Sequence, residues 1–276
     1  MSVSYFDWQE KHNQILGAFE EKHVVISFSG GKDSSLLLDY LQRAQSKFGY
    51  HLDVHGVAFP CHVFLPEEQE QLSLYWQNRG IEITWHQGHD EDEARLDGLL
   101  DKGESPCVVC SNVKKAELFA HFAADEPDWS QMVVVIGYTL WDLASAVVEH
   151  ILRVEFGSKE TGSYQGRLPQ ERFLEIAQRF YPLLDMENGL QVFKPLIHYN
   201  DPDIRSAISE LRIPLTTKEC RFKSYRPKRL LAEYYSLFGL NFTYEDVFEF
   251  AKKSFDLPDK EFFQNQEMAS YVTRMI

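Results

Sequence analysis

The 276-residue sequence contains no long apolar segment and only four cysteines. Its longest apolar runs, such as residues 132–136, are far shorter than the roughly 20 residues that cross a bilayer. The first dozen residues carry neither the basic nor the apolar region of a secretory signal, so we expect a cytoplasmic protein with no membrane partner. In that compartment, the cysteines are expected to be thiols or metal ligands rather than disulfides.

Positive charge is also scarce. The chain has 28 Lys and Arg against 42 Asp and Glu, which gives a net charge of −14. This balance excludes a surface that binds nucleic acid everywhere, although a local basic patch remains compatible with it. Hydrophobic residues make up 44% and aromatics 14%, so a folded globular protein is predicted throughout.

Strand and helix patterns alternate along most of the chain. Strands are predicted at 24–28, 52–59, 81–86, 132–136 and 192–196, and helices at 5–21, 33–47, 67–78, 108–123, 141–153, 170–180 and 201–211. We interpret 87–106 as an acidic loop, the rest of 157–190 as irregular, and the tail beyond 240 as helical. Buried strands separated by helices predict an α/β fold with a doubly wound parallel sheet and a helical C-terminal extension. The expected domains are an N-terminal helix (1–21), an α/β domain (22–215) with an insertion around 157–190, and a basic loop with a helical region (216–276).

A glycine-rich turn stands between the first strand and the next helix. It consists of Ser29, Gly30, Gly31, Lys32, Asp33 and Ser34. Backbone N–H groups and the positive dipole end of a helix bind phosphate, and glycines let a phosphate approach the backbone. The alternative is a tight turn capped by Asp33 or Ser34, but such a cap needs neither two glycines nor a lysine. The spacing of a Walker A loop is absent. We therefore predict a phosphate site, with Asp33 placed to hold Mg²⁺.

Three of the cysteines are candidate metal ligands. Cys107 and Cys110 form a C-x-x-C motif at the start of a helix, and Cys220 lies far along the chain between polar and basic neighbours. The pair could ligate a metal, form a redox couple or merely pack, and Cys220 alone would be a small core residue. A zinc site needs further ligands, and no second C-x-x-C or H-x₃₋₅-H pair supplies them.

The glycine-rich turn and the cysteines together make the sequence similar to a known family. The sequence SGGKDS after the first strand resembles the PP-loop of the N-type ATP pyrophosphatases. With C-x-x-C before the fourth strand and a third cysteine in a basic loop, residues 22–235 resemble the iron–sulfur tRNA sulfurtransferases of the tRNA 2-thiocytidine synthetase type.

The resemblance implies a set of roles for individual residues. Residues 29–34 would grip the pyrophosphate of ATP, and the backbone at Ala58 and Phe59 would contact the adenine. Gly137 and Asp142 would complete the ATP and Mg²⁺ site, in which Lys32 and Asp33 are catalytic. Cys107, Cys110 and Cys220 would hold a [4Fe-4S] cluster with one open iron for sulfur from a donor, so that Cys220 takes part in catalysis. Cys61, just past the second strand, could be a fourth ligand, a sulfur relay or a bystander, and we favour the bystander.

The sequence departs from the family pattern in two places. The family stretch Gly-His-His-x-x-Asp-Asp is replaced by Gly-Tyr-Thr-Leu-Trp-Asp-Leu at 137–143, which keeps only Gly137 and Asp142. The family also tends to have a second cysteine soon after the third, and none follows Cys220. Details of ATP handling and the substrate are therefore open. The alternatives are an enzyme that thiolates or amidates a small molecule and a protein that binds ATP without turnover.

One strongly basic stretch stands out against the acidic total. Residues 212–229 contain seven basic residues and one acid, interleaved with Phe222 and Tyr225. Cations contact phosphates and aromatic rings stack on bases, so this stretch suits RNA and predicts tRNA as a partner. The alternatives are a solvated helix face and cations that balance the acidic residues at 90–104. Whether the protein forms a homodimer is open.

Overall fold

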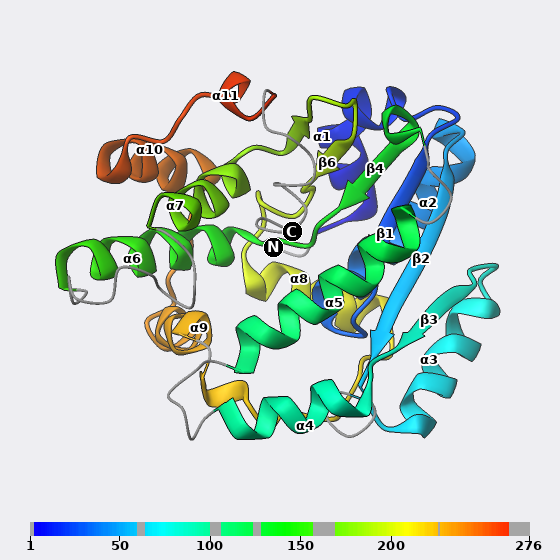
Figure 1. Cartoon of the computed structure of the whole chain (residues 1–276). Coiled ribbons are helices and arrows are strands. Elements are labelled where there is room, and N and C mark those ends of the chain that lie inside the picture. The colour runs from blue at the N-terminus through cyan, green and yellow to red at the C-terminus, as the bar shows by residue number, and fades with distance from the viewer. Residues whose placement is uncertain are drawn as a thin grey trace.

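The computed structural model describes residues 3–59, 64–99, 106–123, 128–156, 169–225 and 227–264. Within them, a six-stranded sheet has the order β3-β2-β1-β4-β6-β5 (Figure 1). The strands are β1 (His23–Ser27), β2 (His51–Ala58), β3 (Ile83–Gln87), β4 (Met132–Val135), β5 (Leu183–Asp185) and β6 (Gln191–Phe193). All neighbouring pairs are parallel except β5 and β6, which are antiparallel.

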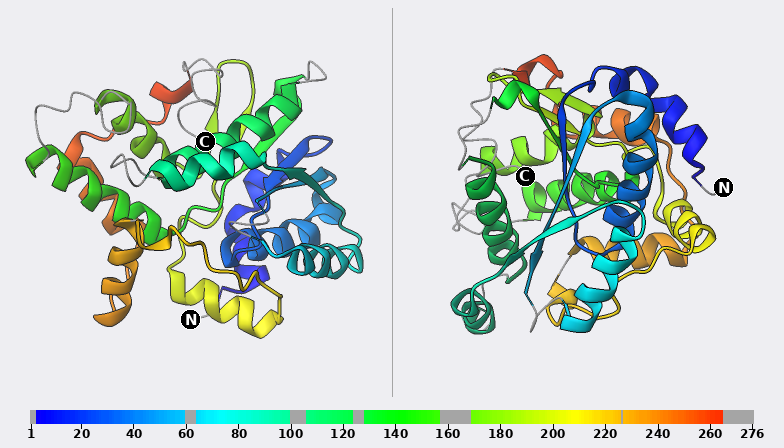
Figure 2. Two further views of the ribbon diagram at one scale, coloured as in Figure 1. Left: turned by 60° about the horizontal axis from the view of Figure 1, so that its bottom comes forward. Right: turned by 90° about the vertical axis from the view of Figure 1, so that its right-hand side faces the viewer.

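Helices connect the strands and cover both faces of the sheet. They are α1 (Tyr5–Gly17), α2 (Lys32–Phe48), α3 (Pro66–Gln77), α4 (Asp90–Leu99), α5 (Pro106–Ala123), α6 (Leu140–Phe156), α7 (Pro169–Ala177), α8 (Asp201–Leu211), α9 (Pro227–Leu237), α10 (Tyr244–Phe255) and α11 (Glu261–Gln264). Three short 3₁₀ turns are η2 (Trp129–Gln131), η3 (Gln178–Phe180) and η4 (Lys223–Tyr225). The right-hand view of Figure 2 shows α2 and α3 on one side of the strands and α5 on the other.

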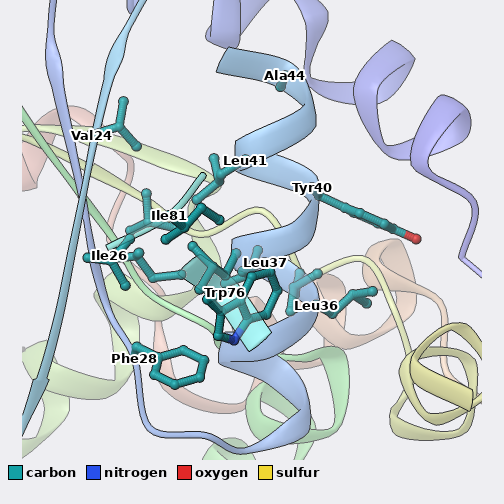
Figure 3. Close-up of a cluster of buried hydrophobic side chains, with 14 of the residues drawn as sticks. Val24, Ile26, Phe28, Leu36, Leu37, Tyr40, Leu41, Ala44, Trp76 and Ile81 are labelled. Atoms are coloured by element: carbon teal, nitrogen blue, oxygen red, sulfur yellow. The ribbon is translucent and has the colours of Figure 1, made fainter. Parts of the chain in front are cut away.

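Alternation along β1 explains why the sheet is buried on both faces. Val24 and Ile26 pack into the core beneath α2, whereas Val25 between them packs into the core beneath α6 and α10. In the first core, Trp76 of α3 is completely buried and lies close to Phe28 and α2 (Figure 3). The predicted doubly wound α/β architecture is confirmed, with one antiparallel edge strand added.

Two local expectations were wrong. The acidic segment 87–106 was predicted to be a loop, but it contains α4. Leu96 and Leu99, one turn apart, are 1% and 4% exposed, so their burial orders the segment as a helix despite its charge. The segment 157–190 was expected to be irregular apart from one helix, but its described part also contains β5. None of the described helices is long and apolar enough to cross a membrane.

The strand order fixes where a ligand can bind. The chain builds outward from β1 through β2 to β3 and then crosses to β4 on the other side of β1. The order reverses between β1 and β4, and ligands of open α/β sheets bind at the carboxyl ends of the strands at such a point. The predicted phosphate turn follows β1 and the 137–142 stretch follows β4, so both lie at this edge.

Candidate active site

The glycine-rich turn has the backbone that a phosphate site needs. Gly30 has φ +67°, and a Cβ there would lie only 3.1 Å from Leu72 Cδ1 and 3.2 Å from a ring carbon of Phe64. Gly31 is the extended N-cap of α2 and supplies no side-chain cap to its first turn. The first-turn N–H groups of α2 therefore face the turn with the positive end of the helix dipole behind them.

Two serines hold the turn in shape. Ser34 Oγ accepts a hydrogen bond from Ser29 N at 3.2 Å and lies 3.1 Å from Ser29 Oγ. Ser29 Oγ in turn accepts from Gly31 N at 3.4 Å, and Ser34 Oγ donates to Gly31 O at 3.1 Å. The turn is thus organised by its own hydroxyl groups before any ligand is present.

Lys32 lies between two carboxylates. Its Nζ is 2.6 Å from Asp33 Oδ1 and 2.5 Å from Asp201 Oδ1 at the start of α8. Burial acts to lower the pKa of Lys32, but the two carboxylates outweigh it and raise that pKa, so the ammonium stays charged. The sequence analysis missed Asp201, because Asn200-Asp201-Pro202 has the ordinary pattern of a helix start.

Asp142 forms a second charged group beside the first. Its Oδ2 accepts from Thr139 N at 2.9 Å, and its Oδ1 contacts Lys228 Nζ of α9. Burial acts to raise the pKa of Asp142, but Lys228 more than offsets this and lowers it, so the side chain is ionised. Burial raises the pKa of Asp33, and the negative charge of Asp142, which lines the same cleft, raises it further.

These groups line one cleft of about 570 Å³. The charged side chains that line it are Lys32, Arg205, Lys228, Arg229, Asp33, Asp142, Asp201 and Glu233, so their formal charges cancel. A triphosphate therefore meets no net positive charge in the cleft, and a divalent cation at Asp33 would offset the negative charge of the phosphates. The residues present therefore fit Mg²⁺. Both oxygens of Asp142 already have partners, so Asp142 can bind the ion only if Lys228 moves, and the side chain of Lys228 is half exposed.

Other predicted ATP residues lie at the same edge. A Cβ on Gly137 would lie 3.4 Å from Asp33 Cβ, so this glycine lets the end of β4 approach the turn. A smaller cavity of about 280 Å³ is lined by Gly137, Ser27 and residues of α5. The carbonyl of Ala58 accepts from Gly88 N at 2.7 Å, and the Phe59 side chain is fully buried. A role for Ala58 and Phe59 in contacting adenine stays a prediction.

The segment between α8 and α9 is fastened directly to the phosphate turn. Thr216 N donates to Gly30 O at 2.9 Å. The carboxylate of Glu68 in α3 accepts from Thr217 N at 2.6 Å, from Lys218 N at 3.0 Å and from Thr216 Oγ1 at 3.0 Å. These bonds bring Cys220, only a few residues further on, to the carboxyl edge of the sheet.

The three cysteines meet there. Cys110 packs with Leu96, Leu99 and Phe222 in one small cluster, against which Cys107 and Cys220 also pack. The thiol of Cys107 donates to Phe222 O at 3.7 Å, and all three cysteines are free thiols. The structure therefore brings together the three predicted ligands. Cys61 lies outside the described residues.

Two kinds of metal group accept such ligands. Zinc and iron–sulfur clusters both bind cysteine thiolates, so the donor set fits either group. Three protein ligands would leave one position of either group open. The choice between zinc and a cluster stays a prediction.

Four cations of the basic stretch 212–229 contact carboxylates in the structure. Arg221 pairs with Asp97 of α4 at 2.9 Å, as expected if cations balance the acidic segment. Lys223 pairs with Glu219, Arg229 with Glu233 at 3.1 Å, and Lys228 with Asp142. A cleft of about 460 Å³ beside Cys220 is nevertheless lined by Arg221, Lys223 and Arg229. RNA binding by this stretch stays a prediction.

We expect Glu68→Gln to weaken the connection between α3 and the Cys220 segment in a pH-dependent way. Burial acts to raise the pKa of Glu68, but hydrogen bonds from Thr217, Leu65 and Thr216 lower it from 4.5 to about 2. Because the folded pKa is depressed, the stabilisation is complete above about 4.5 and is lost as the pH falls towards about 2. The thermal unfolding midpoints of the wild type and Glu68→Gln should therefore differ most near neutral pH and converge in acid. Glu70→Gln on the same helix is the control and should follow the wild type; a difference that does not change with pH would contradict this role for Glu68.

Comparisons with known proteins found partial sequence matches. No protein-family model matches the chain. The chain is 29% identical to the tRNA-cytidine(32) 2-sulfurtransferase of Leptothrix cholodnii over 150 residues, which are 52% of this chain and 41% of that protein. It is 24% identical to the enzyme of the same name from Alkalilimnicola ehrlichii over 204 residues, 71% of this chain and 54% of the other. The chain thus spans about half the length, or less, of the curated relatives it matches.

A solved structure shows the fold. The U34-tRNA thiolase NcsA from Methanococcus maripaludis, determined with its [4Fe-4S] cluster, superposes with a TM-score of 0.63 at 13% identity, over 93% of this chain and 82% of that one. The chain therefore has the α/β fold of that structure, and the predicted resemblance to tRNA sulfurtransferases of the 2-thiocytidine synthetase type is confirmed.

Proposed function

We propose that this protein is an ATP-dependent sulfurtransferase. It adenylates a carbonyl oxygen of a base in tRNA and replaces that oxygen with sulfur, releasing AMP and pyrophosphate. The sulfur passes through a [4Fe-4S] cluster held by Cys107, Cys110 and Cys220. The observation that carries the proposal is the short segment from Thr216 to Cys220, which bonds to the phosphate turn at one end and joins the thiol cluster at the other.

The first half of the reaction uses the cleft at the phosphate turn. The first-turn N–H groups of α2 and Lys32 bind the β- and γ-phosphates of ATP. The base carbonyl oxygen attacks the α-phosphorus, the bond to the bridging oxygen breaks, and pyrophosphate leaves. Bound Mg²⁺ would neutralise the charge that develops on pyrophosphate, and Asp33 is the residue placed to hold it. Lys228 is free to follow the phosphates, because its side chain is half exposed.

The second half exchanges oxygen for sulfur. Reduced sulfur of the hydrosulfide class attacks the activated base carbon, and AMP leaves with the former carbonyl oxygen. No net oxidation occurs in this exchange. A cluster with one open iron supplies a binding position for that sulfur. The thiols lie among Leu96, Leu99 and Phe222, and this apolar surrounding keeps water, the competing nucleophile, away from the activated base.

The cleft beside Cys220 provides an approach for a base. Arg221, Lys223 and Arg229 on its wall suit the phosphates that flank a base splayed out of an RNA loop. Each of these cations already has a carboxylate partner, so RNA binding exchanges a carboxylate for a phosphate.

The test is turnover with defined components. Anaerobically purified protein is incubated with α-labelled ATP, Mg²⁺, sulfide and unmodified tRNA, and AMP, pyrophosphate and thiolated nucleosides are measured. We expect AMP formation to depend on tRNA and to match the thionucleoside formed. AMP formation with no dependence on tRNA would indicate a small-molecule acceptor, and ATP binding without cleavage would indicate a non-catalytic nucleotide-binding protein. Either result contradicts the proposal.

A further inference from the structure

Three histidines from three separate elements meet outside the two clefts described above, neither of which is lined by any histidine that the structure describes. They are His55 on β2, His86 on β3 and His121 in the last turn of α5. One ring nitrogen from each lies within 4.8 Å of the others, the only such trio of potential metal ligands among the described residues. The ring centroids of His86 and His121 are 4.8 Å apart, and those of His55 and His121 are 5.1 Å apart.

The spacing matches that of a tetrahedral metal. Two nitrogens bound to zinc at about 2.0–2.1 Å lie about 3.3 Å apart. His55 Nδ1 and His86 Nε2 are separated by 3.1 Å, which is close to that value. His121 is on the exposed side of the group, so a side-chain rotation can bring its nitrogen the remaining distance without disturbing the sheet.

We propose that His55, His86 and His121 bind one divalent transition-metal ion, with zinc as the ion that fits best. Three imidazole nitrogens are a common donor set for zinc, and water completes the tetrahedron at the exposed side. Glu117 lies one turn before His121 in α5 and so adds negative charge on the same side of that helix. The site is separate from the cysteines and does not depend on the proposed sulfur transfer.

Such an ion would fasten α5 to the sheet. The ring of Phe122, next to His121, packs on His55 at 5.1 Å and also lines the 280 Å³ cavity between α5 and the ends of β1 and β4. The other end of α5 carries Cys107 and Cys110. One metal at the trio would therefore fix the wall of that cavity and the helix that presents two of the thiols.

Cobalt(II) provides the test, because its spectrum reports its ligands. Co²⁺ is titrated into protein purified without added metal, and zinc is then used to displace it. We expect one equivalent of Co²⁺ to give the visible bands of tetrahedral cobalt without thiolate-to-cobalt charge transfer, since the trio contains no sulfur. Any cobalt bound at the three cysteines is a separate equivalent and is recognised by its charge-transfer bands. Zinc should also raise the thermal midpoint of the protein.

Variants separate the trio from other histidines. His121→Ala changes an exposed side chain, so the protein should fold, and we expect it to lose the bands and to bind zinc at least tenfold more weakly. His51→Ala, another histidine on β2 outside the trio, is the matched control and should bind as the wild type does. Failure of the wild type to bind one equivalent, equal binding by His121→Ala, or bands that arise from thiolate ligation alone would each overturn the proposal.

Discussion

Asp33→Asn should reduce pyrophosphate release at least about a hundredfold and leave the fold intact. The substitution keeps the size of the side chain and removes the charge placed to hold Mg²⁺. Lys32 also contacts Asp201, so Asp33 can exchange its contact with Lys32 for the ion while the lysine stays paired. Without the charge of Asp33, the charge that develops on pyrophosphate is offset less. The measurement is the rate of release of labelled pyrophosphate at saturating ATP, with the thermal midpoint recorded in parallel.

The control for this experiment is Glu187→Gln, which removes an exposed carboxylate in the turn between β5 and β6. It should leave the rate unchanged. Raising the Mg²⁺ concentration should partly restore ATP binding by Asp33→Asn but not its rate. If Asp33→Asn cleaves ATP as fast as the wild type, the carboxylate serves only as a favourable charge in the first turn of α2.

Cys220→Ala should remove the metal group and end sulfur transfer altogether. Three thiolates are the minimum set for the proposed cluster, and Cys220 is the one contributed by the segment fastened to the phosphate turn. We expect anaerobically prepared protein to lose its brown colour and its iron and sulfide content. ATP binding should survive, because the turn uses none of the cysteine atoms. The measurements are iron and sulfide analysis, the absorbance spectrum and nucleotide binding.

Variants at the other three cysteines test the same expectation. Cys61→Ala should keep iron and colour if Cys61 is a bystander. Cys107→Ala and Cys110→Ala should match Cys220→Ala, since all three thiols belong to one site. A native protein with one zinc and no iron, or a Cys220→Ala variant with unchanged metal content, would contradict the cluster.

The layout of the fold was predictable from patterns in the sequence, but the charged helix α4 and the short strand β5 were not. Apolar β-branched runs and their alternation with helices predicted the parallel strands correctly. The helix α4 was missed because its acidic composition conceals two leucines that become buried only against the cysteine-bearing α5. The strand β5 has three residues, and pairing with β6, not its own pattern, makes it a strand.

The site was predictable where a local motif defines it. The glycine-rich turn and the C-x-x-C pair are continuous in sequence and were found. Asp201 and the three histidines come from separate segments that tertiary structure alone brings together. No spacing of residues in the sequence therefore predicts them. Lys228 belongs to the basic stretch 212–229, and its contact with Asp142 was not predictable because tertiary structure alone brings the two together.

The bonds between Glu68 and the Cys220 segment have a consequence for biosynthesis. Glu68 and Thr217 are 149 residues apart, so these bonds cannot form until most of the chain has left the ribosome. Cys107 and Cys110 emerge long before Cys220 and must wait as reduced thiols. We therefore expect iron and sulfide to be inserted after translation, into a chain whose nucleotide-binding edge has already folded, and the delivering machinery to meet a nearly native protein.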